Sequence, residues 1–121
     1  RSSKQNILED SILSFSKSHK TNEYDFEQSY KELSNQKLSM RESGCLSLDL
    51  SYVGAGRLDG TWAYDKNLMD IAAGTLIAQE GGALVSDFNG DPKFLNGNNV
   101  VASSSKIYKS ILKSVKPYFK G

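Results

Sequence analysis

The stretch MDIAAGTLIAQEGG, residues 69–82, decides the fold expected for this chain. Asp70 places a carboxylate near its start, where the free backbone N–H groups of a first helical turn favour an anion. The small residues 72–74 leave room for another element to pack closely against that turn. Gly81 and Gly82 at the other end can supply the left-handed residue that terminates a helix. The stretch therefore predicts a helix that Asp70 caps and that packs closely against a neighbour.

Strand and helix patterns alternate along the rest of the chain. Apolar alternation bounded by turn residues marks the strands, and apolar positions three or four residues apart mark the helices. The last helix is expected to be capped by serine and ended by proline. This alternation favours a layered α/β domain with a largely buried sheet. We expect strands at residues 11–16, 37–41, 58–64, 83–88 and 98–102, and further helices at residues 24–35 and 104–117.

Residues 46–51, with the sequence LSLDLS, fit two patterns. Their strict alternation of apolar and polar side chains is typical of a strand. Leu46, Leu50 and Val53 also share one helical face, and Gly56 suits a helix end. The residue pattern alone leaves both structures open.

Length and composition indicate one folded domain over residues 1–121. Of its 121 residues 38% are hydrophobic, and the net charge of +1 favours no class of partner. The single cysteine, Cys45, excludes an internal disulfide and fits a reducing, cytoplasmic compartment. No apolar run reaches the roughly 20 residues of a membrane span. Residues 1–10 are polar and expected to be loose, and the start at Arg1 is expected to be a truncation.

Four segments, taken in order, resemble the C-terminal half of the inositol monophosphatase family. The pattern Asp-x-Ala-Ala-Gly, continued by Glu-x-Gly, begins at Asp70 and is similar to the family's second signature. Residues 48–60, 85–90 and 98–102 are similar to its bacterial branch. The resemblance implies a layered αβα domain, with a mixed, mostly parallel sheet flanked by helices, and a helix over residues 44–55. The Gly-Glu-Glu and Asp-Pro-Ile/Leu-Asp-Gly-Thr motifs of the family's first half are missing here.

The resemblance also implies a chemistry. Members of the family are Mg²⁺-dependent phosphatases of small phosphorylated polyols and sugars, and the aspartate that matches Asp70 is a metal ligand in them. One aspartate cannot hold Mg²⁺ tightly, because the ion prefers several carboxylate, phosphate and water oxygens. The metal activates water and stabilises the leaving oxygen in such sites. We therefore expect Asp70 to complete a site whose other carboxylates lie on the missing half, so that this chain alone holds no complete catalytic set.

Residues 41–46, with the sequence RESGCL, resemble the family's Arg-x-x-Gly-[Ser/Thr]-Ala-Ala turn, whose backbone contacts substrate. Gly44, Cys45 and Leu46 are accordingly the expected substrate-binding residues, since free N–H groups at a helix start suit an anion. The alternative is an ordinary helix N-terminus. Cys45 is expected to be a packed thiol, not a nucleophile, because no base lies near it in the sequence. Leu46 stands in place of a small alanine and is expected to narrow the pocket or shift its helix.

Other positions depart from the family pattern. Ala63 stands where many members carry a glutamate that binds a substrate hydroxyl, and Asp65 lies about 6–7 Å further along a strand. Met69 replaces the usual tryptophan and Ala83 replaces a second glycine. Inositol specificity is therefore open, and other sugar phosphates or a nucleotide-derived bisphosphate are alternative substrates. Residues 58–61, LDGT, imitate the end of a missing metal motif but predict only a turn.

Three further features are expected to be structural. His19 stands alone in a polar loop, and Glu80 lies nearly three helical turns from Asp70, too far to share a metal. Lysines of the last helix recur on the stripe opposite its apolar residues, which predicts a solvated face. The alternative, contact with RNA or an acidic protein, is weakened because no aromatic residues interleave with these lysines. The stripe consists of Lys106, Lys109, Lys113, Lys116 and Lys120.

Two hypotheses follow for the whole chain. In the first, it is the C-terminal domain of a Mg²⁺-dependent phosphatase that hydrolyses a small phosphomonoester, such as inositol 1-phosphate or a sugar phosphate. In the second, it is a non-catalytic binding or interaction module derived from that fold. The expected partners are a phosphorylated polyol or sugar and the missing N-terminal half; a membrane or nucleic acid is not expected. The missing half should leave apolar surface exposed, which predicts self-association.

Overall fold

The computed structural model describes residues 1–5, 7–17, 21–64, 66, 68–92 and 99–118, and of Glu23, Leu68, Asp70 and Tyr118 it describes the backbone only. His19, Asp65, Asn98 and Lys120 lie outside the described residues. The strands are β1 (Ile12–Ser16), β2 (Ser39–Arg41), β3 (Gly60–Ala63), β4 (Leu84–Ser86) and β5 (Val100–Ser103). The helices are α1 (Glu23–Ser34), α2 (Leu46–Gly54), α3 (Leu68–Glu80) and α4 (Tyr108–Val115), and a 3₁₀ turn, η2 (Lys116–Tyr118), follows α4.

The strands form one five-stranded sheet in the order β2-β1-β3-β5-β4. β1 pairs in parallel with β2 and with β3, whereas β5 pairs antiparallel with β3 and with β4. Four strands therefore run in one direction and β5 runs against them. This arrangement confirms the predicted mixed, mostly parallel sheet.

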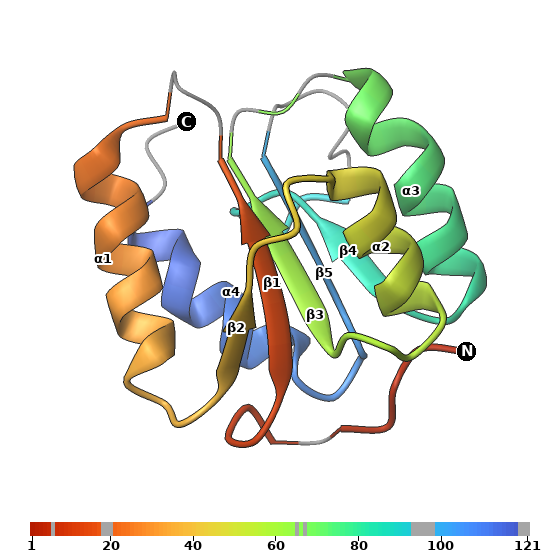
Figure 1. Ribbon diagram of the computed structural model, residues 1–121, viewed down its shortest axis with the longest axis horizontal. Helices are drawn as coiled ribbons and strands as arrows, with labels where there is room; N and C mark the ends of the chain where they lie inside the picture. The colour runs from red at the N-terminus through yellow and green to blue at the C-terminus, as the bar shows by residue number, and fades with distance from the viewer. Residues whose placement is uncertain (6, 18–20, 65, 67, 93–98, 119–121) are drawn as a thin grey trace.

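Helices cover both faces of the sheet (Figure 1). α1 and α4 lie on one face, and α2 and α3 lie on the other. Each face has its own apolar core, built from alternate residues of the same strands. In β1, for example, Leu13 faces α1 and α4, while Ser14 points to the opposite face. The predicted three-layer αβα architecture is thus confirmed.

The α1/α4 face is filled by aromatic side chains. Trp62 of β3 is fully buried, and its ring centroid lies 5.4 Å from that of Phe15. Phe26 packs against Phe15 at 5.4 Å, and Tyr64 meets Phe88 edge to face at 4.8 Å. Rings of this size bury much apolar area and prefer tilted or edge-on contacts. This face supplies the bulkiest part of the core.

Glycines allow α2 and α3 to pack closely against each other on the opposite face of the sheet. A methyl group added at Gly54 would lie 2.7 Å from the Ile77 carbonyl oxygen, and one at Gly74 would lie 2.8 Å from the Leu50 side chain. A methyl group at Gly81 would collide with the backbone of Gly54. The close packing predicted for residues 72–74 is therefore confirmed for Gly74, whereas Ala72 and Ala73 are exposed and do not make it.

The ends of α3 differ from the prediction in detail. The helix begins at Leu68, so Asp70 is its third residue and not its cap. A carboxylate at this position still lies in the favourable field of the first turn. At the other end Gly82, with φ of +95°, supplies the left-handed residue, and the Ala83 N–H donates to the Ala78 carbonyl at 3.0 Å.

The ambiguous residues 46–51 are helical. Leu46, Leu50 and Val53 are buried together against the sheet, whereas Leu48 is 41% exposed. A strand would have put Leu46, Leu48 and Leu50 on one face. The helical conformation is therefore favoured, because it buries three apolar side chains that have helical spacing.

The last helix starts later than predicted. α4 begins at Tyr108, and no side chain caps it. The Ser104 hydroxyl instead donates to the Gln5 carbonyl at 3.2 Å, so the predicted serine cap is wrong. Pro117 follows the end of α4 by two residues, as predicted. Within the described residues, no helix is long and apolar enough to cross a bilayer.

The N-terminal segment makes defined contacts, in contrast to the expectation that it is loose. Leu8 is buried, and the Ser2 N–H donates to the Gly81 carbonyl at 2.7 Å. At the same end of the sheet, the Asp59 carboxylate accepts a hydrogen bond from the Ile12 N–H at 2.7 Å. The Ser104 N–H donates to the Asp59 carbonyl at 2.9 Å. Asp59 thus ties the bend before β3 to its neighbours, in line with the predicted turn.

Candidate functional site

The candidate site lies at the carboxyl ends of the parallel strands. β2 leads into α2 and β3 leads into α3, so both helices begin at this edge of the sheet (Figure 1). Ligands of open α/β sheets bind at this edge, where the loops and helix N-termini meet. The fold therefore brings Gly44, just before α2, and the backbone of Asp70, in the first turn of α3, to one edge. The Asp70 side chain lies outside the described part of the structure.

The turn before α2 presents backbone N–H groups to solvent. Gly44 has φ of +79°, and no atom lies within 4 Å of the place where a Cβ would stand. No described residue accepts a hydrogen bond from the N–H of Gly44, Leu46, Ser47 or Leu48. Such donors, together with the helix dipole, favour an anion.

Two side chains of this turn differ from their predictions. Cys45 is exposed, so it is not a packed thiol, and it is the N-cap of α2 without a side-chain capping bond. Leu46 is only 4% exposed and packs into the core with Leu50 and Val53. It therefore faces away from the ligand-accessible side, and only its N–H remains available there.

A buried carboxylate lies directly behind the turn. Asp49, in the first turn of α2, is 2% exposed. Its Oδ1 accepts a hydrogen bond from the Ser43 hydroxyl at 2.7 Å, and the Ser43 Oγ accepts one from the Cys45 N–H at 3.1 Å. Its Oδ2 receives no hydrogen bond of good geometry from the described residues. The sequence analysis did not select Asp49, although a lone aspartate on the buried face of residues 46, 50 and 53 could have drawn attention to it.

The surroundings of Asp49 act on its charge in opposite directions. Burial raises the pKa of the Asp49 carboxyl above its ordinary value of 3.8. The hydroxyls of Ser43 and Ser14 favour the charged form and hold this pKa down in part. The ammonium group of Lys66, in the loop after β3, acts in the same direction from further away. Lys66 itself donates to the Lys17 carbonyl at 3.4 Å, so it bridges the loops after β1 and β3.

The strands beneath Asp49 carry small polar side chains. Ser14 of β1 donates to Thr61 of β3 at 2.6 Å, and both are fully buried. Ser16, next on the same face, is 3% exposed, and its hydroxyl finds no partner among the described residues. Ala63, paired with Ser16, is also buried. Because Ala63 carries no polar group, β3 offers no acceptor for a substrate hydroxyl at that position.

The oxygen atoms near this edge are suited to binding a hard cation such as Mg²⁺, but the described residues do not form a complete metal site. The oxygen atoms of carboxylates and hydroxyls are the ligands that Mg²⁺ prefers. Among the described side chains, no three His, Cys, Asp or Glu groups come together. Asp59 is occupied by the Ile12 N–H at the other end of β3, and Glu80 lies at the far end of α3 from Asp70. The backbone of Asp70, in the first turn of α3, lies at this edge.

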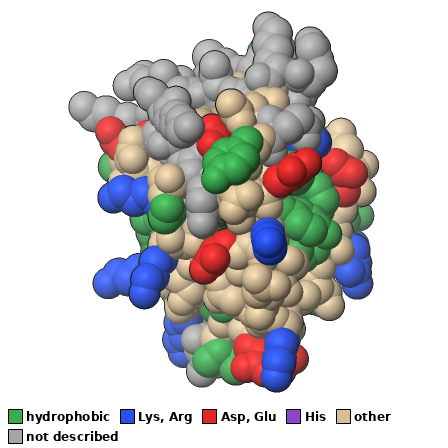
Figure 2. All heavy atoms as spheres, turned by 90° about the vertical axis from the view of Figure 1, so that its left-hand side faces the viewer, with side chains coloured by type: hydrophobic (Ala, Val, Ile, Leu, Met, Phe, Trp, Pro, Cys, Tyr) green, Lys and Arg blue, Asp and Glu red, His purple; other side chains and the backbone are tan. Residues whose placement is uncertain are grey.

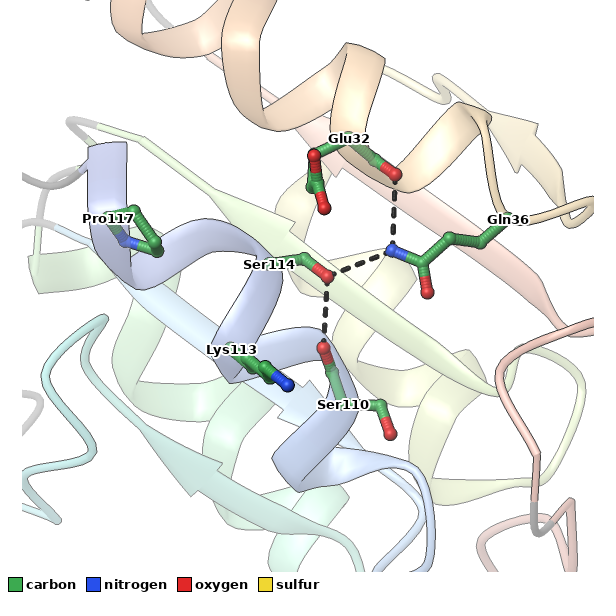
Figure 3. Close-up of a pocket in the computed structure, with 6 residues that line it drawn as sticks. All are labelled: Glu32, Gln36, Ser110, Lys113, Ser114 and Pro117. Atoms are coloured by element: carbon green, nitrogen blue, oxygen red, sulfur yellow. Dashed lines mark hydrogen bonds between the residues drawn. The ribbon is translucent and has the colours of Figure 1, made fainter.

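The α1/α4 side holds a separate hollow (Figure 3). Gln36 crosses it, donating to the Glu32 carbonyl at 3.1 Å and to the Ser114 hydroxyl at 3.1 Å. These bonds join the end of α1 to α4. The lining residues are Glu32, Gln36, Ser110, Lys113, Ser114 and Pro117.

The charged surface is mixed. Lys106, Lys109, Lys113 and Lys116 are exposed, opposite the buried Ile107, Ile111 and Val115, as the predicted stripe requires. Figure 2 shows acidic and basic side chains interspersed on the side of the molecule where α1 lies. Neither the row of lysines nor the mixed charges on the α1 side identifies a partner by itself.

Comparison with known proteins agrees with the fold and the edge. The model of the inositol monophosphatase family matches residues 1–118, and the chain belongs to this family. It is 42% identical over 89 residues to the Nus factor SuhB of Pseudomonas aeruginosa, covering 74% of this chain and 33% of that protein. It is 44% identical over 77 residues to the inositol-1-monophosphatase of Mesorhizobium japonicum, covering 64% of this chain and 29% of that protein.

A solved structure gives the same result for the fold. The extragenic suppressor protein SuhB of Bartonella henselae superimposes with a TM-score of 0.91 at 28% identity, covering 96% of this chain and 45% of that one. The chain thus spans about a third to a half of the length of these relatives. The predicted family and fold are confirmed.

Proposed function

We propose that this chain is the C-terminal half of a Mg²⁺-dependent phosphatase that hydrolyses a small phosphomonoester. The observation that carries the proposal is the meeting of two helix N-termini at one edge of the sheet. The first is the turn at Gly44 with its free N–H groups, and the second is the first turn of α3 with Asp70. Metal-assisted hydrolysis of such an ester uses both a place for the anion and a metal ion that activates water.

The residues of the chain would divide the work as follows. The N–H groups of Gly44, Leu46 and Ser47 would hold the substrate's oxygens, because no described residue accepts a hydrogen bond from them and they lie at the positive end of α2. Asp70 would hold Mg²⁺ together with carboxylates of the missing N-terminal half. Mg²⁺ supplies an activated water and stabilises the leaving oxygen in sites of this kind.

The class of substrate is inferred from the name of a relative and from the residues at the same edge of the sheet. The relative from Mesorhizobium japonicum is named an inositol-1-monophosphatase. Ala63 offers no acceptor for a substrate hydroxyl, which weakens the case for inositol 1-phosphate. A sugar phosphate, or a nucleotide-derived bisphosphate, is the alternative within the same reaction.

The exposed apolar face of α3 supports the proposal that the missing N-terminal half is a partner of this chain. Met69, Leu76 and Ile77 are 85%, 58% and 47% exposed, and the exposed Ala72 and Ala73 lie between them. The opposite face of α3 is buried against α2 and the sheet. A helix that is apolar on both faces is typical of a helix enclosed between two layers. We propose that the rest of a full-length relative covers this face, and that a second copy of the chain covers it when the rest is absent.

Phosphate release provides the test of the activity. The chain would be assayed with Mg²⁺, using inositol 1-phosphate and p-nitrophenyl phosphate, alone and mixed with the remaining N-terminal part of the Mesorhizobium japonicum relative. We expect release from the mixture only, and we expect Asp70→Asn to abolish it. Glu80→Gln, on the same helix, is the matched control and should keep it. Release that survives Asp70→Asn would contradict the metal role, and release by the chain alone would contradict the half-site.

An interaction module is the second candidate. The Pseudomonas aeruginosa relative is named a Nus factor and not a phosphatase. The four exposed lysines along α4 and η2 lie on the face of the sheet opposite α2 and α3, so they could bind an acidic partner without involving the site. Charge reversal of Lys109 and Lys113 to glutamate would weaken such binding while leaving phosphate release unchanged.

A further inference from the structure

The buried Asp49 is not part of the ligand-accessible surface, and no role given above uses it. We propose that Asp49 is a positioning residue, which acts through Ser43 to hold the turn before α2 in the conformation that presents its N–H groups. This inference rests on the proposed function of that turn.

The contacts form a short relay. The Asp49 carboxylate accepts from the Ser43 hydroxyl at 2.7 Å, and the same hydroxyl oxygen accepts from the Cys45 N–H at 3.1 Å. The Asp49 N–H closes the ring by donating to the Cys45 carbonyl at 3.1 Å. The Ser43 hydroxyl also lies 3.3 Å from the Cys45 carbonyl oxygen, but the shorter contact with a charged acceptor favours donation of its one hydrogen to Asp49. In that arrangement a lone pair of the Ser43 oxygen is free to accept from the Cys45 N–H.

The relay replaces an ordinary helix cap. Cys45 occupies the N-cap position of α2, but its side chain makes no capping bond. Without a cap, the entry angle of the chain would be loosely defined. Gly44 has a positive φ and no side chain, so it cannot fix the turn by packing. The hydrogen bond from Ser43 to Asp49 is short and joins this turn to a buried group of the helix, whereas the Cys45 sulfur only approaches the Ser47 hydroxyl, at 3.8 Å.

The position of Asp49 is costly, which argues that it has a role. A carboxylate at 2% exposure, with one oxygen that receives no hydrogen bond of good geometry from the described residues, is an unfavourable way to fill a core. Leu46, Leu50 and Val53 surround it on the same helical face. An apolar residue would suit that face better if packing were the only requirement.

Selective labelling gives a direct test, because Cys45 is the only cysteine. Incorporation of ¹⁵N-cysteine yields one amide signal, whose exchange with water can be measured by NMR without any ligand. Loss of a hydrogen bond to or through a charged group is worth enough to raise this exchange at least about tenfold. We expect this rise in Ser43→Ala and in Asp49→Asn, and we expect Ser43→Thr to restore slow exchange.

Asp87→Asn is the matched control. The Asp87 carboxylate also holds a turn, accepting from the N–H groups of Asn89 at 2.8 Å and Asp91 at 2.9 Å, but it lies beyond β4. Asp87→Asn should leave the exchange rate of the Cys45 amide unchanged. Wild-type exchange in Ser43→Ala would overturn the proposal, as would unchanged exchange in Asp49→Asn when Ser43→Ala raises it. If Asp49→Asn does not fold, Asp49→Ala takes its place, because the Ser43 variants alone do not test Asp49.

The outcome is separable from the proposed function. Titration of inorganic phosphate into the same labelled protein reports whether the turn binds an anion. Fast exchange in the variants without phosphate binding in the wild type would leave the positioning role intact and contradict the function of the turn. Phosphate binding by the wild type, with unchanged exchange in Ser43→Ala, would support the function of the turn and contradict the positioning role.

Discussion

The two faces of the sheet are built from the same strands but from different kinds of side chain. The face toward α1 and α4 is packed with rings, among them Phe15, Trp62 and Phe88. The face toward α2 and α3 holds small aliphatic residues, glycine contacts and the buried polar group Asp49. The first face is arranged for burial of apolar area, and the second brings two helix N-termini together. The comparison suggests that stability and ligand binding are assigned to opposite faces.

The largest effect should come from the aromatic face. Trp62→Ala would empty a fully buried site at the centre of the sheet, and we expect it to lower the free energy of unfolding by about 3–5 kcal/mol. Urea denaturation measures this. Tyr24→Ala, at the exposed start of α1, is the control and should change stability by less than about 0.5 kcal/mol. A loss below about 1 kcal/mol for Trp62→Ala would remove the distinction between the faces.

Glycine replacement should have an intermediate effect on the opposite face. Gly81→Ala would force the end of α3 away from the backbone of Gly54, and we expect a cost of about 1–3 kcal/mol from overpacking. Thermal unfolding followed by circular dichroism would record the loss. Ala73→Ser, exposed on the same helix, serves as the control. A Gly81→Ala variant as stable as the wild type would mean that α2 and α3 do not need this close approach.

The smallest effect concerns the pH dependence of stability. Burial raises the pKa of Asp49 above its unfolded value, so the folded state binds more protons than the unfolded state between the two values. The contribution of Asp49 to stability is therefore complete below pH 3.8 and is lost as the pH rises through its folded pKa. We expect Asp49→Asn to gain stability relative to the wild type as the pH rises from about 4 to 7. Urea unfolding of both proteins across this range would show it, and a pH-independent difference would contradict it.

The sequence predicted the family, the layers and the main elements, because strongly periodic segments and ordered motifs carry that information. The residue pattern alone could not choose between strand and helix for residues 46–51, and the family resemblance gave the helix over 44–55 that the structure confirms as α2 (Leu46–Gly54). The exposure of Cys45 and the inward direction of Leu46 also escaped prediction. Both depend on how α2 sits on the sheet, which local patterns do not contain.

The candidate site was predicted only in part. The turn at Gly44 and the edge that carries Asp70 follow from motif order, and the structure brings their backbones to the same edge. Asp49 and Lys66 were missed. The contact of Lys66 with the Lys17 carbonyl joins two loops that meet only in the folded sheet, so no local spacing reveals it. The contact of Asp49 with Ser43 spans six residues, and the position of Asp49 on the apolar face of residues 46, 50 and 53 was the signal available for it.

The central claim is that the α2/α3 edge, and not the lysine stripe of α4, receives the phosphate group. A titration of ¹⁵N-labelled chain with inorganic phosphate, followed by two-dimensional NMR, tests it most directly. The account predicts saturable shifts of the amide signals of Gly44, Leu46 and Ser47, at millimolar concentration or tighter, with Lys109 and Lys113 unaffected. Shifts centred on Lys109 and Lys113, or none at the turn, would contradict it.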